Sequence, residues 1–141
     1  MGHTASIALG VALGNPARRV LCLDGDGSVL MHFGALPIIG SLNPANLVHV
    51  LLNNAAHESV GGQPTVAGHL DFASVAKACG YHHYYLATDA ETLSRCWEQL
   101  DQQRGPILLE IRILAGSRDD LGRPTSTPEQ NKRAFMEHAR G

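Results

Sequence analysis

Four short apolar runs alternate with segments of helical spacing along this chain of 141 residues. The runs are typical of buried strands, and they cover residues 19–24, 46–52, 81–86 and 107–114. Strands that alternate with helices form a mostly parallel sheet, because each parallel pair needs a helical crossover between its two strands. We therefore predict a single α/β domain over residues 1–141, with three layers (α/β/α) and the first strand buried on both faces.

The segment from Ser28 to about Gly40 has helical spacing and is apolar all round. We predict one helix here, capped by Ser28 and kinked or shortened by Pro37. We expect its apolar side chains, Met31 and Ile38 among them, to be buried.

The remaining helices have clear start and stop signals. A first helix ends at Gly14-Asn15-Pro16, Asp71 caps a helix that Gly80 ends, and an amphipathic helix with Trp97 in the core follows Asp89. Residues 115–141 are expected to form a polar loop and a short helix of the same domain, the helix covering about residues 128–138.

Charge and composition exclude several classes of partner. The formal net charge is −2, so no basic field attracts nucleic acid or an anionic membrane. The start of the chain has neither a basic leader nor a long apolar run, which favours a soluble, cytoplasmic protein. The three cysteines (Cys22, Cys79 and Cys96) do not have zinc-ribbon spacing, and we expect buried free thiols. The scattered histidines, His49 among them, are assigned structural or surface roles.

Polar turns follow the first two predicted strands. Gly25-Asp26-Gly27-Ser28 ends the first strand, and Asn53-Asn54 ends the second. Because adjacent parallel strands end at the same edge of a sheet, Asp26 and Asn54 are expected side by side. A carboxylate, an amide oxygen and a backbone carbonyl are hard ligands for Mg²⁺ that also holds a phosphorylated ligand. Alone, the Gly-Asp-Gly turn favours a plain turn over a metal site; together with the paired asparagines it favours a metal-bridged diphosphate.

These motifs resemble those of thiamine diphosphate-dependent 2-oxoacid decarboxylases, in which a Gly-Asp-Gly turn precedes a pair of asparagines. Residues 53–65 (NNAAHESVGGQPT) and 116–128 (GSRDDLGRPTSTP) are similar to segments of the phosphonopyruvate decarboxylase type. Met1-Gly2-His3 resembles the family's approach to the helix that precedes the first motif. The resemblance covers essentially the whole chain and implies the thiamine diphosphate-binding fold.

The resemblance also implies ligands for thiamine diphosphate and Mg²⁺. Asp26 and Asn54 would bind the metal through side chains, and Ala56 through its carbonyl. The residues implied to contact the cofactor are Gly25, Asp26, Gly27, Ser28, Asn54, Ala56 and His57.

Roles in the reaction are less determined by the sequence. His57 is consistent with either a structural or a proton-transfer role. Glu58 is a candidate acid or base, or a solvated loop carboxylate. Arg118 and Arg123 are candidate substrate residues, or members of a surface loop paired with Asp119 and Asp120.

The implied activity is decarboxylation of 3-phosphonopyruvate to phosphonoacetaldehyde, and the implied active site is composite. Family members have an upstream strand and helix in this domain, which we expect to be missing here, and a separate pyrimidine-binding domain. We therefore expect a pyrimidine-binding domain or subunit as partner, an oligomer, and no activity without it. A sulfopyruvate decarboxylase beta-type subunit and a non-catalytic domain that retains the fold are the alternatives.

Overall fold

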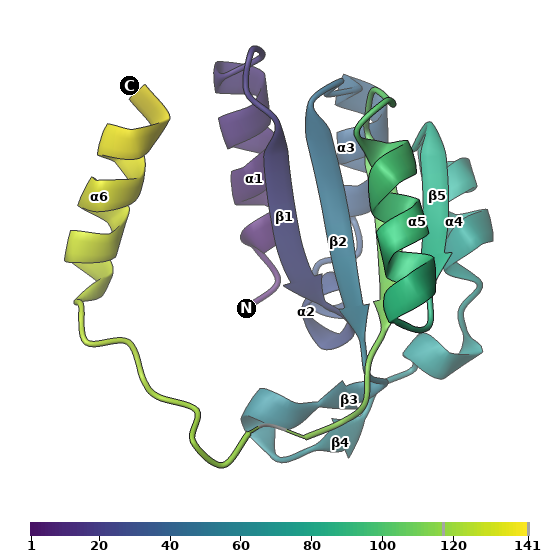
Figure 1. Ribbon diagram of the computed structural model, residues 1–141, viewed down its shortest axis with the longest axis vertical. Coiled ribbons are helices and arrows are strands. Elements are labelled where there is room, and N and C mark those ends of the chain that lie inside the picture. The colour runs from purple at the N-terminus through teal and green to yellow at the C-terminus, as the bar shows by residue number, and fades with distance from the viewer. Residues whose placement is uncertain (117, 141) are drawn as a thin grey trace.

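The computed structural model describes residues 1–116 and 118–140 and contains a four-stranded parallel sheet (Figure 1). Its strands are β1 (Val20–Gly25), β2 (Leu47–Asn53), β5 (His83–Ala87) and β6 (Ile107–Arg112). They lie in the order β1-β2-β6-β5, and every neighbouring pair is parallel. The predicted α/β architecture is confirmed.

Helices cover both faces of this sheet. One layer holds α1 (Thr4–Gly14), α3 (Ala35–Leu42) and α4 (Phe72–Cys79), and the opposite face carries α5 (Ala90–Leu100). Asp71 caps α4 and Gly80 ends it, as the sequence predicts. The last helix, α6 (Pro128–Arg140), stands beside the sheet (Figure 1). A hydrogen bond joins it to the segment before β1, because Arg18 Nη1 donates to the carbonyl of His138 at 2.7 Å.

The prediction that the first strand is buried on both faces is wrong. Cys22 and Asp24 are buried, but the side chains of Leu21 and Leu23 are 47% and 63% exposed. The reason is the position of β1 at the edge of the sheet, because the core under α5 is built on β2, β5 and β6. Among the described residues no strand pairs with the outer edge of β1, where Leu21 and Leu23 line a pocket with residues of α1 and α6.

The single helix predicted from Ser28 to Gly40 is also wrong. The chain forms a short α2 (Asp26–Met31), with Gly25 as its N-cap, and then α3 after a turn. Ser28 lies within α2 and does not cap it. Pro37 lies in the first turn of α3, where a proline is tolerated without kinking the helix. Met31 and Ile38 are exposed rather than buried, because the helices face the sheet with one side only.

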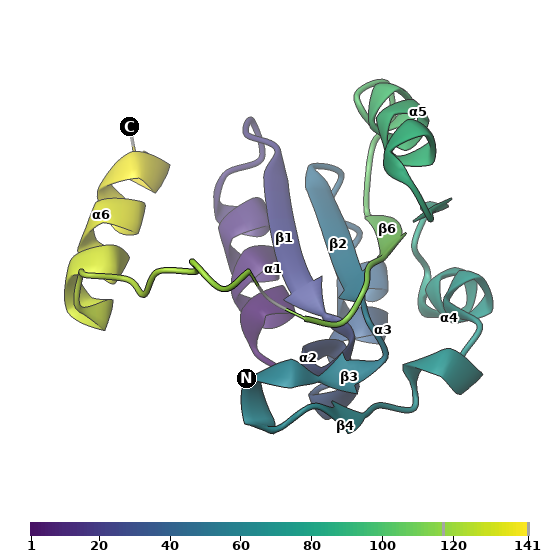
Figure 2. The ribbon, with the colours of Figure 1, turned by 60° about the horizontal axis from the view of Figure 1, so that its bottom comes forward.

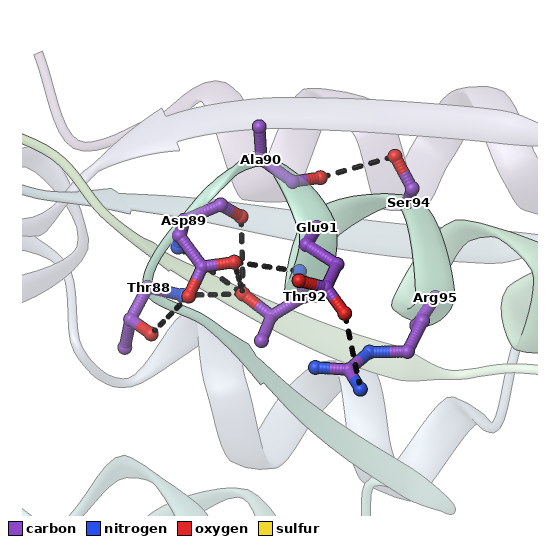
Figure 3. Close-up of polar contacts among 7 residues, drawn as sticks. All are labelled: Thr88, Asp89, Ala90, Glu91, Thr92, Ser94 and Arg95. Carbon is purple, nitrogen blue, oxygen red and sulfur yellow. Dashed lines mark hydrogen bonds and ion pairs between the residues drawn. The ribbon is translucent and has the colours of Figure 1, made fainter.

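Helix α5 begins at a capping box, drawn in Figure 3. The Asp89 carboxylate accepts from the backbone N–H of Thr92 at 2.7 Å, and Thr92 Oγ1 accepts from the Asp89 N–H at 3.1 Å. The hydrogen bonds that the carboxylate accepts from the N–H and the hydroxyl of Thr92 hold the Asp89 pKa below its usual range. The expected core position of Trp97 is a further error, since its side chain is exposed while Cys96 and Leu100 are buried.

The predicted loop between β2 and α4 contains short regular elements at the carboxyl edge of the sheet. Strands β3 (Ala56–His57) and β4 (Gln63–Pro64) pair antiparallel. The 3-10 turn η1 (Glu58–Val60) connects them, and a second 3-10 turn, η2 (Ala67–His69), follows β4. In Figure 2 these elements lie beside α2. The loop is thus an ordered cover over the strand ends.

Several properties of the chain can be read from the described residues. None of the described helices has the length and apolarity needed to cross a membrane. All three cysteines are free thiols, of which Cys22 and Cys96 are buried and Cys79 is partly exposed. Ser117, part of the segment that resembles phosphonopyruvate decarboxylases, lies outside the described residues.

Helices α3 and α4 meet at a glycine. A Cβ added at Gly40 would overlap the backbone carbonyl of Cys79, whereas a Cβ at Gly10 in α1 would meet nothing within 4 Å. Backbone cannot retreat as a flexible side chain can, so this contact requires glycine at position 40.

We predict that Gly40→Ala destabilises the fold by about 1–3 kcal/mol, because α3 must move away from α4. The matched control, Gly10→Ala, should be neutral or stabilise by up to about 1 kcal/mol, since alanine is the better helix former. Urea denaturation followed by circular dichroism measures both. Equal effects of the two substitutions would contradict this account of the contact.

Candidate functional site at the carboxyl edge of the sheet

The two polar turns meet at one cleft. In the parallel register of β1 and β2, Gly25 pairs with Leu52, so Asp26 and the asparagines follow their strands at the same edge. The described residues that line the cleft are Met1, Gly25, Asp26, Gly27, Ser28, Leu52, Asn54, Ala56, His57, Glu58, Ser59 and Ile113. Seven of these residues are the cofactor ligands implied by the sequence.

Asp26 is held rigidly at the base of this cleft. Its side chain is almost fully buried, with 1% of its surface exposed. Thr65 Oγ1 donates to Asp26 Oδ2 at 2.5 Å, and the Thr65 N–H donates to the carbonyl of Ala55 at 2.8 Å. The loop that carries the asparagines therefore also positions the carboxylate. Sequence reasoning assigned no role to Thr65, because only the folded loop brings it to Asp26.

The two asparagines turn in different directions. Asn54 Oδ1 accepts from the N–H of Ala56 at 3.0 Å, and Asn54 Nδ2 donates to Glu58 Oε2 at 2.9 Å. Asn53 Oδ1 accepts from the N–H of Ala55, at 3.1 Å. Ala55, which lies within these two hydrogen-bonded turns, has a positive φ of 56°. Asn54 thus faces the cleft, while Asn53 braces the turn behind it.

Behind the turn lies a buried carboxylate that the sequence reasoning missed. Glu110 on β6 accepts from Asn53 Nδ2 at 2.9 Å and from the Tyr84 hydroxyl at 2.6 Å. Arg112 Nε lies 3.6 Å from Glu110 Oε1. Burial, followed by the hydrogen bond to Glu110, raises the pKa of Tyr84. A glutamate within the apolar run 107–114 was the available signal, since a buried charge needs partners.

Glu58 joins the cleft to the chain beyond β6. Its Oε2 accepts from Asn54, and its Oε1 accepts from the N–H of Gly116. Both carboxylate oxygens are therefore engaged, although the side chain is exposed. This arrangement ties Asn54 to the start of the polar segment that leads to α6.

His57 packs on Gly27. A Cβ at position 27 would collide with Nδ1 and Cε1 of the His57 ring, so only glycine permits this approach. Ser28 faces the N-terminal segment, because its Oγ accepts from the N–H of Gly2 at 3.1 Å. Met1 consequently lies at the cleft, a position that sequence reasoning did not assign.

The two candidate substrate arginines lie elsewhere. Neither Arg118 nor Arg123 lines the cleft, and both are exposed. Arg118 Nε lies 3.3 Å from Asp120 Oδ1, with both side chains in solvent. This pair is the surface-loop arrangement that the sequence left open; a substrate role for either arginine stays a prediction.

The donor set suits a hard cation and an anionic ligand. Asp26, Asn54 and Ala56 line one cleft, and they can offer a buried carboxylate, an amide oxygen and a backbone carbonyl, the type of oxygen ligand that Mg²⁺ prefers. The missing Cβ of Gly27 leaves room for the His57 ring, which packs against this glycine beside the cleft. The residues present therefore fit a metal-bound, phosphorylated group.

Comparison with known proteins supports this chemistry. Residues 1–111 match the family described as "Thiamine pyrophosphate enzyme, C-terminal TPP binding domain". The chain is 44% identical to a phosphonopyruvate decarboxylase of Streptomyces viridochromogenes over 96% of this chain and 34% of that protein. It is 37% identical to the sulfopyruvate decarboxylase subunit beta of Methanothermobacter thermautotrophicus, over 84% of this chain and 61% of that subunit.

A solved structure shows the same fold. The thiamine diphosphate-dependent 4-hydroxybenzoylformate decarboxylase of Rhodococcus jostii RHA1 superposes with a TM-score of 0.70 at 22% identity, over 84% of this chain and 24% of that one. The chain spans about a third of the length of the phosphonopyruvate decarboxylases it matches. With its family match over residues 1–111, the chain belongs to the thiamine pyrophosphate enzymes, as their C-terminal TPP-binding domain.

Proposed function

We propose that this chain is the diphosphate- and metal-binding part of a decarboxylase that converts 3-phosphonopyruvate to phosphonoacetaldehyde and carbon dioxide. The observation that supports it most directly is the meeting of Asp26 and Asn54 in one cleft. That cleft belongs to a thiamine pyrophosphate-binding domain, and the chain is 40–44% identical to two phosphonopyruvate decarboxylases.

In this proposal, Asp26, Asn54 and the carbonyl of Ala56 hold Mg²⁺. Thr65 occupies one oxygen of Asp26 and leaves the other carboxylate oxygen for the cation. Asn54 Oδ1 accepts one N–H from Ala56 and keeps a second lone pair for the metal. Because the loop already positions these groups, they lose little conformational entropy when the metal binds.

The diphosphate of thiamine diphosphate would lie against Gly25, Gly27, Ser28 and His57. These four residues line the cleft beside Asp26 and Asn54, and a bound Mg²⁺ would neutralise part of the diphosphate charge. Thiamine diphosphate supplies the electron sink that a 2-oxoacid needs to lose carbon dioxide. The residues of this chain bind the group, orient it and limit the access of water.

Besides Asp26, which is assigned to the metal, Glu58 and His57 are the ionisable side chains that line the cleft. Both oxygens of Glu58 already accept hydrogen bonds, one from Asn54 and one from Gly116. This supports a positioning role for Glu58 toward Asn54, while the second lone pair on each oxygen keeps an acid–base role open. His57, packed on Gly27, keeps either a structural or a proton-transfer role.

We further propose that the active site is completed by a pyrimidine-binding domain or subunit within an oligomer. The open edge of β1, with exposed Leu21 and Leu23, supports an additional strand and helix there, from a preceding segment or another chain. An exposed apolar strand edge readily pairs with further chain. The cleft alone would then bind the cofactor without turnover.

Sulfopyruvate decarboxylation is the second candidate function. The chain covers 61% of a sulfopyruvate decarboxylase beta subunit, a larger share than the 34% of either phosphonopyruvate decarboxylase. Phosphonate and sulfonate both need cationic or N–H partners, but they differ in charge. The phosphonate is supported by the higher identity to the two phosphonopyruvate decarboxylases, 44% and 40% over 96% and 99% of this chain, against 37% over 84% for the sulfopyruvate decarboxylase subunit.

We predict that Asp26→Asn weakens Mg²⁺-dependent binding of thiamine diphosphate at least about tenfold, because the cation loses its charged ligand. Isothermal titration calorimetry of the full chain, with and without Mg²⁺, measures this. The control is Asp119→Asn, an exposed carboxylate in the segment that follows β6, which should bind as the unmodified chain does. Equal affinity of the Asp26 variant would overturn the metal assignment.

We predict that a complex of this chain with a pyrimidine-binding partner releases carbon dioxide faster from 3-phosphonopyruvate than from 3-sulfopyruvate at equal concentration. Carbon dioxide release and aldehyde formation measure both reactions, with the Asp26→Asn complex as a blank. A preference for the sulfonate would replace the phosphonate assignment. Cofactor binding without turnover of either substrate would support the non-catalytic alternative.

We predict that Glu58→Gln weakens Mg²⁺-dependent cofactor binding, because an amide cannot accept from both Asn54 and Gly116 with its two terminal atoms. Glu91→Gln, on exposed α5, is the matched control. If binding is unchanged and the pH profile of the complex loses one limb, Glu58 acts in proton transfer and the positioning role is wrong.

A further inference from the structure

A second group of polar side chains lies beneath the sheet, on the face opposite the exposed Leu21 and Leu23. Cys22 on β1 pairs in register with His49 on β2, and Asp24 follows two residues later on the same side of β1. All three residues are buried within the layer that α1, α3 and α4 cover. None of them lines the cleft that holds Asp26 and Asn54.

The reactive atoms of these three residues converge. One thiol sulfur, one imidazole nitrogen and one carboxylate oxygen lie within 4.8 Å of one another. His49 Nε2 is 3.5 Å from Asp24 Oδ2, beyond the usual length of a hydrogen bond. Within residues 1–116 and 118–140, neither of these two atoms has a hydrogen-bond partner.

The burial of Asp24 Oδ2 and His49 Nε2 without hydrogen-bond partners calls for a physical explanation. The exposed fractions of His49 and Asp24 are 0% and 4%, so bulk water does not compensate for the missing hydrogen bonds. A buried polar group without a partner is costly, and native proteins retain few of them. A cation between the two atoms would satisfy both.

His49 is also oriented as a metal ligand should be. Its other ring nitrogen, Nδ1, lies 3.0 Å from the buried hydroxyl of Tyr81. A histidine that binds a metal through one nitrogen commonly donates its second N–H to a neighbouring acceptor, which fixes the ring. With the proton on Nδ1, the lone pair of Nε2 is directed toward Asp24.

We propose that Cys22, Asp24 and His49 form a binding site for one transition-metal cation of the Zn²⁺ class, distinct from the Mg²⁺ site at the cleft. Thiolate, imidazole and carboxylate together are the ligands that Zn²⁺ takes, whereas Mg²⁺ prefers oxygen alone. The thiol releases its proton to solvent as the sulfur–metal bond forms. The thiolate and the carboxylate then balance the two positive charges of the cation.

The geometry requires only a small contraction. In a tetrahedral zinc site the ligand atoms are about 3.3–3.7 Å apart, given bonds of about 2.0–2.3 Å. The ligand atoms now lie within 4.8 Å of one another, and the three side chains would rotate to reach that separation while the paired strands keep their backbones in place. A small ligand completes the fourth position. The bound cation would tie β1 to β2 directly beneath the start of the cleft.

Cobalt is the probe that separates this site from the cleft. The full chain is refolded with one equivalent of Co²⁺ and excess Mg²⁺, because buried ligands accept metal best during folding. We expect a thiolate-to-cobalt charge-transfer band at one cobalt per chain, bleached by Zn²⁺. Cobalt bound only at the oxygen ligands of the cleft gives no such band.

Variants assign the band to residues. Cys22→Ser should abolish it, Asp24→Asn should weaken or shift it, and Cys79→Ser should leave it unchanged. Asp26→Asn should also retain the band, so loss of cofactor binding at the cleft and failure of this proposal are distinguishable. A band that survives Cys22→Ser overturns the proposal, as does a folded chain that shows no band.

X-ray absorption at the zinc edge of the unmodified chain tests the site without any substitution. We expect one sulfur neighbour at about 2.3 Å and nitrogen or oxygen neighbours at about 2.0–2.1 Å. This measurement decides the question even if a variant fails to fold. A first shell without sulfur would overturn the assignment.

Discussion

The parallel pairing of β1 with β2 is the constraint on which the rest of this structure depends. It aligns Gly25 with Leu52, so the Gly-Asp-Gly turn and the paired asparagines leave the sheet at the same edge. The crossover through α2 and α3 makes the two strands run in one direction. Without this register, Asp26 and Asn54 would be separate polar turns rather than two walls of one cleft.

Hydrogen bonds between side chains, and from backbone N–H groups to side chains, hold the groups at this shared edge in place. Thr65 fixes Asp26, Ala56 fixes Asn54, and Glu58 joins Asn54 to Gly116. Behind them, buried Glu110 holds Asn53 and Tyr84. The groups that face the cleft are therefore placed before any ligand arrives, which is the condition for strong binding of a metal-bridged anion.

The same two strands have different roles on their different sides. At the carboxyl edge they present oxygen ligands, and under α1 and α3 they bring Cys22 and Asp24 against His49. Toward the other face, β1 leaves Leu21 and Leu23 uncovered. The domain thus combines a cleft lined by oxygen ligands with an exposed apolar strand, the two features on which the proposed composite active site rests.

The sequence by itself determined the parallel α/β architecture and the position of Asp26 and Asn54 at one edge of the sheet. Strand periodicity and turn residues are local signals, and topology rules convert them into positions in the fold. The sequence did not determine which face of β1 is covered, that residues 26–42 form two helices, or that Trp97 is exposed. Those features depend on neighbours distant in the chain. The roles of Thr65 and of the Cys22–Asp24–His49 cluster, and the partners of Glu110, were not predictable for the same reason: tertiary packing alone brings these groups together.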